Sequence, residues 1–270
     1  MTAIADLRTL CRLTLAPVSG GNHAERMESF YQQQASDYDS FRERLLPGRR
    51  EMVQQLPLHE GAVWVDLGRG TGANLEFVAD LVPKLGKVFV VDLAPSLLEQ
   101  TRQRCERHGW SNVEVITADA TRFELPIKAD VVTCSYSLTM IPDWFAAVDR
   151  ATEMLKSGGT FGAVDFYVSR KHPEVGYAKH SWFTRTFWPT WFAFDNVHLQ
   201  SDHVRYLHRH FECRRFLENY HAIAVGAARP RAVVSVRRPQ GVSRGAVRNH
   251  IASSSRWNSS GLRIRFTCVV

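Results

Sequence analysis

The apolar run Ala62–Leu67 enters a glycine-rich turn, and this junction limits what the chain can fold into more than any other feature. A short and continuously apolar segment is typical of a parallel strand that is buried on both faces. The turn that follows reads Gly68-Arg69-Gly70-Thr71-Gly72. Glycine permits unusual backbone angles, and its missing side chain lets a ligand lie against the backbone. The junction therefore predicts a buried strand that delivers a ligand-binding turn into a helix.

Strands and helices alternate through the rest of the central region. Further strands are expected at 88–92, 113–116, 129–134 and 160–165, and helices at 74–85, 95–108 and 144–155. Two last strands are expected at 211–217 and 232–236. This alternation predicts an α/β fold of the Rossmann-like, doubly wound type, with a mostly parallel seven-stranded sheet.

Three regions differ from this alternating pattern. Residues 1–56 are expected to form an N-terminal helical lid, and residues 57–238 the domain that holds the sheet. Within that domain an aromatic-rich insertion covers 170–210 and places seven aromatic residues between positions 182 and 194. Residues 239–270 are rich in serine, arginine and asparagine without a sustained period, which predicts a basic, disordered tail.

The net charge of +7 raises the question of a nucleic-acid partner. Residues 229–270 contain nine arginines and no acidic residue, so residues 1–228 hold the remaining 25 basic side chains against 27 acidic ones. A body close to neutrality lacks the electrostatic footprint of a nucleic-acid-binding domain, so no nucleic-acid partner is expected. Scattered cysteines, the absence of a spanning apolar run and charges within the N-terminal apolar stretch predict a cytosolic protein.

Acidic residues follow three successive predicted strands. Asp66 ends the first, Asp92 the second, and Asp119 comes just after the third. The carboxyl ends of parallel strands share one edge of an open sheet, where such folds bind ligands. Asp66 suits a cofactor with ammonium and sulfonium groups better than a pyrophosphate. Asp92 can accept from two ribose hydroxyls, and Asp119 from an adenine amino group beside the backbone N–H of Ala120.

An NAD-dependent oxidoreductase is the nucleotide-binding alternative, because dinucleotide folds use a similar glycine turn and a similarly placed acid. The glycine spacing and Asp119 favour the cofactor with ammonium and sulfonium groups over NAD. Asp66–Gly72, Asp92, Asp119 and the strand before Cys134 resemble the motifs of class I methyltransferases across about residues 60–165.

This resemblance implies S-adenosylmethionine as the cofactor. Its carboxypropyl group would lie near Asp66, Gly68, Gly70 and Gly72, its ribose on Asp92, and its adenine between Leu93 and the Asp119–Ala120 pair. Ser135 and Tyr136, just past the fourth strand, would border the transferred methyl group. Arg69 is a departure, because the family more often has a small residue at this position.

Other segments resemble bacterial betaine-lipid N-methyltransferases over about residues 1–238. The resemblance implies three methylations of the amine of diacylglyceryl-homoserine, at the inner surface of the membrane. It also makes Tyr38 a candidate lid residue, with Arg42 or Arg49 reaching the cofactor carboxylate, although either arginine could be a surface charge. The segments are His23–Tyr31, Asp37–Arg42, Leu46–Arg49, Asp66–Asn74, Ser135–Pro142 and Trp191–Asp195.

The aromatic insertion suits an apolar acceptor, either a lipid or a hydrophobic amine. Tryptophan and phenylalanine enter the membrane interface, and aromatic rings stabilise cations by about 0.5–2 kcal/mol per contact. The same rings could instead be core residues of a helical cap. Candidates to contact the acceptor amine are Tyr136, Asp165 and His198, and those for a headgroup carboxylate are Arg170, Lys171 and Arg185.

Two other classes share parts of this pattern. A methyltransferase of quinones or other small hydrophobic molecules would have the same fold and an apolar pocket. A binding protein that has lost turnover would keep the fold, but the three intact acids count against it. No cysteine or acidic partner completes a metal-ligand pattern with His208 and His210, so no metal site is expected.

Overall fold

The computed structural model describes residues 21, 25–26, 28–29, 46, 48–68, 70–193, 196–222 and 228–237, with the backbone alone for 219–222 and 228–237. Most of the predicted lid, including Tyr38 and Arg42, lies outside the described residues. So do Arg69 of the glycine turn and the basic tail 239–270. The proposed boundaries at 56 and 238 stay predictions.

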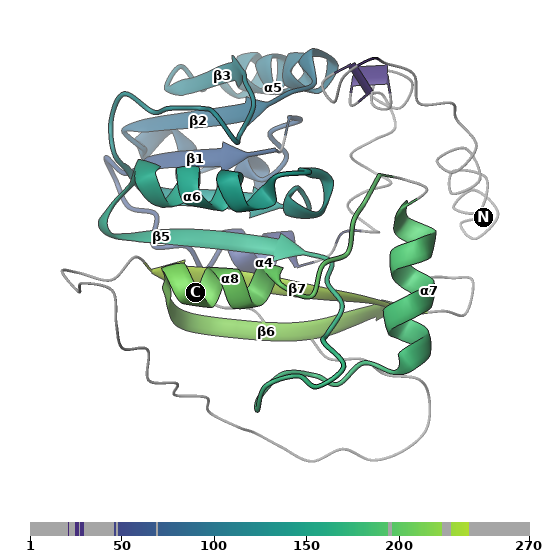
Figure 1. Cartoon of the computed structure of the whole chain (residues 1–270). Helices are drawn as coiled ribbons and strands as arrows, with labels where there is room; N and C mark the ends of the chain where they lie inside the picture. Colours follow the sequence, from purple (N-terminus) through teal and green to yellow (C-terminus); the bar gives the residue numbers. More distant parts are fainter. Residues whose placement is uncertain are drawn as a thin grey trace.

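The described strands form one sheet in the order β3-β2-β1-β4-β5-β7-β6 (Figure 1). Strands β1 to β5 run parallel, as the alternating sequence pattern predicts, and β7 pairs antiparallel with both β5 and β6. The sheet order reverses between β1 and β4, which is where open α/β sheets bind ligands. The strands are β1 Val63–Leu67, β2 Lys87–Asp92, β3 Val113–Thr117, β4 Ala129–Ser135, β5 Leu155–Asp165, β6 Glu212–Ala222 and β7 Ala228–Arg237.

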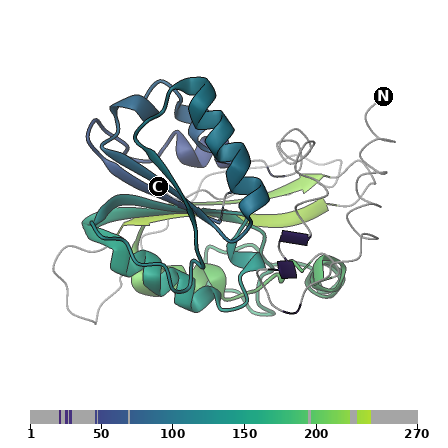
Figure 2. The same cartoon turned by 90° about the horizontal axis from the view of Figure 1, so that it is seen from above.

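Helices cover both faces of the sheet and make three layers (Figure 2). Helices α4 (Arg49–Val53) and α5 (Pro95–His108) lie on one face, and α6 (Trp144–Met154) and α8 (His203–His210) on the other. Helix α5 begins at Pro95, whose missing N–H costs nothing in a first turn, and ends at Gly109 in the left-handed conformation. Helix α7 (Trp182–Ala193) lies beyond the carboxyl ends of the parallel strands (Figure 1).

The α-helix expected at 74–85 is wrong. The segment forms two short 3₁₀ helices, η1 (Leu75–Val78) and η2 (Val82–Lys84). Pro83 explains the difference, because it has no N–H to donate to the carbonyl four residues earlier and so interrupts an α-helical ladder. The backbone instead closes tighter turns, with Leu81 N donating to Val78 O at 2.8 Å and Lys84 N to Leu81 O at 2.9 Å.

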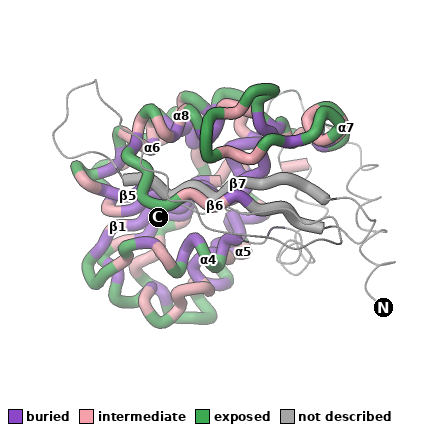
Figure 3. The backbone as a smooth tube through the Cα atoms, turned by 90° about the horizontal axis from the view of Figure 1, so that it is seen from below, coloured by how far each residue is buried: buried purple, intermediate pink, exposed green. Residues whose placement is uncertain are grey.

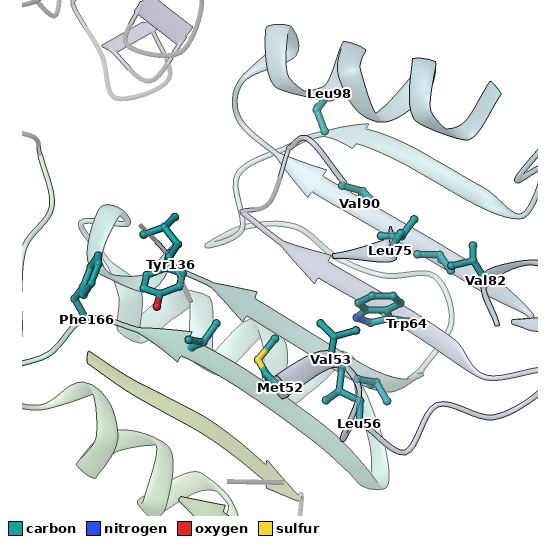
Figure 4. Close-up of a cluster of buried hydrophobic side chains, with 14 of the residues drawn as sticks. Met52, Val53, Leu56, Trp64, Leu75, Val82, Val90, Leu98, Tyr136 and Phe166 are labelled. Atoms are coloured by element: carbon teal, nitrogen blue, oxygen red, sulfur yellow. The ribbon is translucent and has the colours of Figure 1, made fainter. Parts of the chain in front are cut away.

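Alternate residues of the strands fill two hydrophobic clusters, one on each face. Trp64, Val90 and Val131 pack beneath α4 and α5, where Met52 and Leu98 meet them (Figure 4). Val65, Phe161 and Phe211 belong to the cluster beneath α6 and α8. Each fully buried apolar side chain contributes about 1.5–3 kcal/mol, so the strand ends are held in place by a firm core. Among the described residues, no helix is long and apolar enough to cross a bilayer.

Candidate functional site

Asp66 lies at the centre of a buried polar network at the end of β1. It is fully buried, Thr133 Oγ1 donates to its Oδ1 at 2.7 Å, and Asn74 Nδ2 donates to its Oδ2 at 2.9 Å. Trp64 Nε1 donates to Thr133 Oγ1 at 2.8 Å and so fixes the hydroxyl. Burial raises the pKa of the Asp66 carboxyl to about 7, although these hydrogen bonds act in the opposite direction.

Asn74 links the two central strands and still has an unused acceptor. Its Nδ2 contacts Ser135 Oγ at 2.9 Å as well as Asp66, which joins the ends of β4 and β1. Its Oδ1 is buried and has no hydrogen-bond partner. A buried carbonyl oxygen without a donor is costly, so this atom marks a place where a ligand's N–H fits. Asn74 was not predicted as a site residue, although a polar residue two positions after the third glycine could have drawn attention.

Asp92 at the end of β2 holds the glycine turn. Its Oδ2 accepts from Gly70 N at 2.8 Å and its Oδ1 from Ala94 N at 2.9 Å, while the residue stays partly exposed. Leu93 follows it and is also partly exposed. Helix α5 fastens the turn from the other side, because Thr101 Oγ1 donates to Gly70 O and Arg104 Nη1 donates to Thr71 O. Thr101 and Arg104 belong to no recognisable motif and were not predicted as site residues.

The glycines serve protein packing more directly than the sequence analysis expected. A Cβ on Gly68 would lie 2.5 Å from Ser137 Cβ, and one on Gly70 would lie 2.6 Å from Leu97 Cβ. Gly68 also has a φ of +66°, which L-residues rarely adopt. The missing side chains therefore let α5 and the segment after β4 approach the turn, in addition to any ligand.

Asp119 lies beside Asp92 on the neighbouring strand. Ala118 N donates to the Asp92 carbonyl at 3.0 Å, which places the end of β3 next to that of β2. One oxygen of Asp119 accepts from Thr121 N at 2.9 Å and Thr121 Oγ1 at 2.8 Å. Asp119 remains partly exposed and Ala120 is buried. The structure thus brings the three predicted acids to one sheet edge.

Arg49 is buried, so a surface charge is excluded for it. The side chain is 3% exposed, its Nε donates to Leu46 O at 3.2 Å, and its guanidinium lies 5.6 Å from the ring centre of Phe77. Its Nη1 is buried without a hydrogen-bond partner. Phe77 belongs to η1, which Asn74 precedes directly. An unpartnered cationic donor and an unpartnered acceptor therefore flank the same short helix.

The three candidate catalytic residues gather around Thr139, in η3 (Leu138–Met140). Both oxygens of Asp165 are engaged, with Thr139 Oγ1 at 2.7 Å and Thr139 N at 3.1 Å. Burial raises the pKa of this carboxyl to about 6. His198 is exposed, and its backbone N donates to Thr139 O at 2.7 Å. Tyr136 is buried at a φ of 53°, in the left-handed region.

Aromatic rings continue from Tyr136 toward α7. The ring of Tyr136 lies 4.8 Å from that of Phe166 (Figure 4), and Phe166 lies 4.9 Å from Phe192 on α7. Trp188, one turn earlier on α7, is also buried. This inner face of α7 is a core contact, as the helical-cap interpretation expects, whereas other aromatics of the same helix are exposed. Phe194 lies outside the described residues.

The three basic candidates for a carboxylate differ in their surroundings. Arg170 is exposed and forms an ion pair with Asp202, and Lys171 is exposed. Arg185 on α7 is partly buried, and its Nε has no hydrogen-bond partner. Of the three, Arg185 has the donor that is most available to an anionic group inside the protein.

Comparison with known proteins identifies the class of this domain. The family model described as "Methyltransferase domain" matches residues 65–159. Aklanonic acid methyltransferase DauC of Streptomyces sp. strain C5 is 29% identical over 140 residues, which are 51% of this chain and 64% of that protein. Demethylmenaquinone methyltransferase of Geobacillus stearothermophilus is 26% identical over 142 residues, which are 50% and 60%.

Solved structures share the fold. N-methyltransferase NodS from Bradyrhizobium japonicum WM9, in complex with S-adenosyl-L-homocysteine, has a TM-score of 0.60 at 15% identity and covers 81% of this chain and 100% of that one. An S-adenosylmethionine-dependent methyltransferase from Aquifex aeolicus has a TM-score of 0.53 at 15% identity and covers 77% and 97%.

Fold and matched segment together define the class: the chain carries a class I, S-adenosylmethionine-dependent methyltransferase domain. The match spans somewhat less than two thirds of the length of the curated relatives.

Proposed function

We propose that the whole chain is an S-adenosylmethionine-dependent methyltransferase of a small hydrophobic acceptor, such as a quinone or another aromatic compound. The ring series from Tyr136 through Phe166 to Phe192 carries this proposal, because it begins directly after Ser135, at the end of β4. Apolar and aromatic walls with few polar groups are typical of sites for such molecules. The relatives named for demethylmenaquinone and aklanonic acid support the same class of acceptor.

The unpartnered atoms around η1 fit the amino-acid end of the cofactor. S-adenosylmethionine carries an ammonium and a carboxylate on one carbon. Asn74 Oδ1, beside the Asp66 carboxyl, can accept from the ammonium, and Arg49 Nη1 can donate to the carboxylate. The sequence resemblance offered Arg42 or Arg49 for this role, and the burial of Arg49 supports Arg49. Tyr38 and Arg42 remain proposed lid and cofactor residues.

The nucleoside end fits the ends of β2 and β3. Asp92 accepts from Gly70 N and Ala94 N at the partly exposed end of β2, and a carboxylate oxygen can accept more than one hydrogen bond, which supports Asp92 as the acceptor from ribose hydroxyls. Asp119 uses one oxygen for Thr121, which leaves Oδ2 for an adenine amino group. Leu93 and the backbone of Ala120 would border the adenine, with Gly68, Gly70 and Gly72 along the turn.

The bound cofactor supplies an electrophilic methyl group on a sulfonium. The task of this chain is alignment, because an in-line displacement requires the acceptor atom, methyl and sulfur to be collinear. Ser135 and Tyr136, at the end of β4, would border the transferred methyl group. Asp165 acts through Thr139 and positions the η3 turn, since both of its oxygens are engaged there. His198 has an exposed side chain next to this turn and can take the proton that a hydroxyl or amine acceptor releases.

N-methylation of diacylglyceryl-homoserine to the trimethylated betaine lipid is the second candidate function. The segments before Gly48 and around Ser135–Pro142 support it by their resemblance to betaine-lipid N-methyltransferases. Arg185 offers an unpartnered Nε for the carboxylate of that headgroup, and the aromatic rings would stabilise the methylated amine. No relative reported above has a name that refers to a betaine lipid.

Transfer of a labelled methyl group tests both candidates. The full chain is incubated with methyl-labelled S-adenosylmethionine and, in separate reactions, with a demethylated quinone or diacylglyceryl-homoserine, followed by chromatography of the extracted products. Label in the quinone supports the first proposal, and label in the glycerolipid supports the second. Measurable cofactor binding without transfer to either acceptor contradicts both. The Asp92→Ala variant is the control for background transfer.

A further inference from the structure

Helix α7 exposes large aromatic side chains on its outer surface. Trp182 is 72% exposed and Phe183 56%, and Trp191 is also exposed. In the described part of the chain, the other exposed large apolar side chains, Ile127 among them, belong to separate segments. Figure 3 shows α7 as a mostly exposed helix at one side of the molecule. Clustered exposed aromatics indicate an interaction surface, whereas scattered ones need no explanation.

The exposed rings connect without a break to the acceptor side of the site. Phe183 stacks on Phe187, with centroids 4.9 Å apart and planes at 11°. From Phe187 the contacts pass to Trp188 at 5.0 Å, then to Phe192 at 6.2 Å. Phe192 reaches Phe166 at 4.9 Å and hence Tyr136 at the end of β4. The series runs from the surface of α7 to the predicted position of the methyl group.

The charge around these rings has one dominant sign. Residues 168–193 contain four lysines and arginines and one acidic residue, Glu174, which pairs with Arg205 at 3.2 Å. Arg170 is paired with Asp202. In the described structure, the charged groups of Lys171 and Lys179, which precede α7 in the sequence, are exposed and form no ion pair, so two positive charges are available to an anionic surface. Each basic side chain close to an anionic bilayer contributes about 1 kcal/mol of attraction.

We propose that α7 docks on a lipid bilayer that contains anionic lipids, with its exposed rings in the interfacial region and Lys171 and Lys179 against headgroup phosphates. Tryptophan beside basic residues is the composition that helices in this interface use. The inference deepens the proposed function, because docking would place the ring series where a hydrophobic acceptor leaves the bilayer. The docking itself does not depend on which acceptor is methylated.

Vesicle sedimentation of the full chain tests this proposal. Vesicles of phosphatidylcholine alone are compared with vesicles containing phosphatidylglycerol, at physiological ionic strength. The test variant is Trp182→Ser combined with Phe183→Ser, and the matched control is Ile127→Ser, an exposed apolar residue that is 45% exposed and lies outside α7. All three proteins keep the arginine-rich segment 229–270, so its attraction to anionic vesicles is common to them.

The parent and the control are expected to bind anionic vesicles, and the double variant to bind them at least about tenfold more weakly. This result would support the proposal. Equal binding of all three, or no binding by the parent, would overturn it. A second copy of the chain is the competing occupant. Light scattering that shows a dimer lost in the double variant, without vesicle binding by the parent, would also overturn the proposal.

The same samples separate this inference from the proposed function. Isothermal titration with S-adenosylhomocysteine should give the same Kd for the parent and the double variant, since Trp182 and Phe183 are not among the residues proposed to bind the cofactor. Absence of methyl transfer to a quinone would contradict the proposed function and leave vesicle binding intact. Absence of vesicle binding by the parent, together with transfer to a detergent-solubilised quinone, would overturn the docking proposal and leave the proposed function intact.

Discussion

The cofactor end and the aromatic end of the site lie at the same sheet edge but are built from different interactions. At the cofactor end, Asp66, Asn74 and Asp92 are fixed by hydrogen bonds of 2.8–2.9 Å that require particular donors and acceptors. At the aromatic end, Phe166 and Phe192 make ring contacts of 4.8–4.9 Å. Ring packing tolerates exchange among apolar side chains of similar volume. The identity of the residues therefore indicates which cofactor binds, whereas the acceptor is reflected in the shape of the aromatic end.

Shortening Phe192 to alanine should give the largest effect on stability. Its side chain is buried between Phe166 and Trp188, and truncating a buried phenylalanine leaves a cavity that costs about 3–5 kcal/mol. Urea unfolding measures the loss. Trp191→Ala, on the exposed side of the same helix, is the control and should cost less than about 1 kcal/mol. A fall in cofactor affinity that matches the fall in stability would show that the two ends are not separate.

Neutralising Asp66 should change how stability depends on pH. The folded carboxyl has a pKa of about 7 against an ordinary 3.8, so the folded state holds its proton more tightly than the unfolded state does. The stabilising contribution is complete below pH 3.8 and is lost as the pH rises through 7. Between these limits, the free energy of unfolding of Asp66→Asn should gain about 2–4 kcal/mol relative to the parent.

Urea titrations across this pH range measure that gain. The Asn74 amide can turn its unpartnered Oδ1 toward the new amide, so the variant is expected to fold. Asp165→Asn is a second case and should change over a narrower range, since its pKa is raised to about 6. Parallel pH curves for the parent and Asp66→Asn would contradict the prediction.

Removing the Asp92 carboxylate should weaken cofactor binding about 100-fold, which corresponds to about 2.7 kcal/mol. The loss would combine the proposed hydrogen bonds to the ribose with the hydrogen bond that Gly70 N donates to Asp92. Calorimetric titration of Asp92→Ala with S-adenosylhomocysteine measures the effect, and Asp92→Asn, which keeps one acceptor, should lose about tenfold. A thermal melt checks that both variants are folded. An Asp92→Ala variant that binds as well as the parent would remove Asp92 from the site.

Two glycines with nearly the same backbone angle test how tightly the glycine turn is packed. Gly68 has a φ of +66° and a crowded Cβ position, whereas Gly109 has a φ of +67° and nothing within 4 Å. Gly109→Ala should cost about 1–2 kcal/mol from the backbone alone. Gly68→Ala should cost about 1–2 kcal/mol more, because its Cβ would meet Ser137. Equal unfolding free energies for the two variants would show that the turn is not tightly packed.

Local patterns predicted much of the fold. The predicted helix 95–108 coincides with α5, because Pro95 and Gly109 mark its ends chemically. The helix predicted at 74–85 does not form, because Pro83 interrupts it despite the helical spacing of its apolar residues. The extent of β5, which begins at Leu155 immediately after α6, could not be predicted either, since Gly158 and Gly159 indicated a turn. Leu155 pairs with Ala129 of β4 and Thr160 with Val131, across a shift in register, and such tertiary pairing is invisible in local sequence.

Residues of the candidate site were predictable where ligand binding requires a particular hydrogen-bonding group. Asp66, Asp92 and Asp119 were found because acids at strand ends form a pattern. Asn74 and Arg104 were missed because their roles depend on partners 61 and 33 positions away in sequence. The burial of Arg49 was equally hidden, since an arginine in a helix is usually exposed. Side chains that act through distant partners become visible only when the sheet brings the strands together.

Tyr136 lies between the cofactor end and the aromatic end of the site, and its backbone conformation is unfavourable in free energy. A tyrosine at a φ of 53° is less stable than glycine in that conformation by about 1–2 kcal/mol. The backbone conformation alone would favour glycine or asparagine at this position. The chain instead keeps a ring that packs on Phe166 where the methyl group is expected. Tyr136→Gly should therefore destabilise the fold less than Phe192→Ala does, because relief of the backbone offsets about 1–2 kcal/mol of the lost ring packing, while turnover falls.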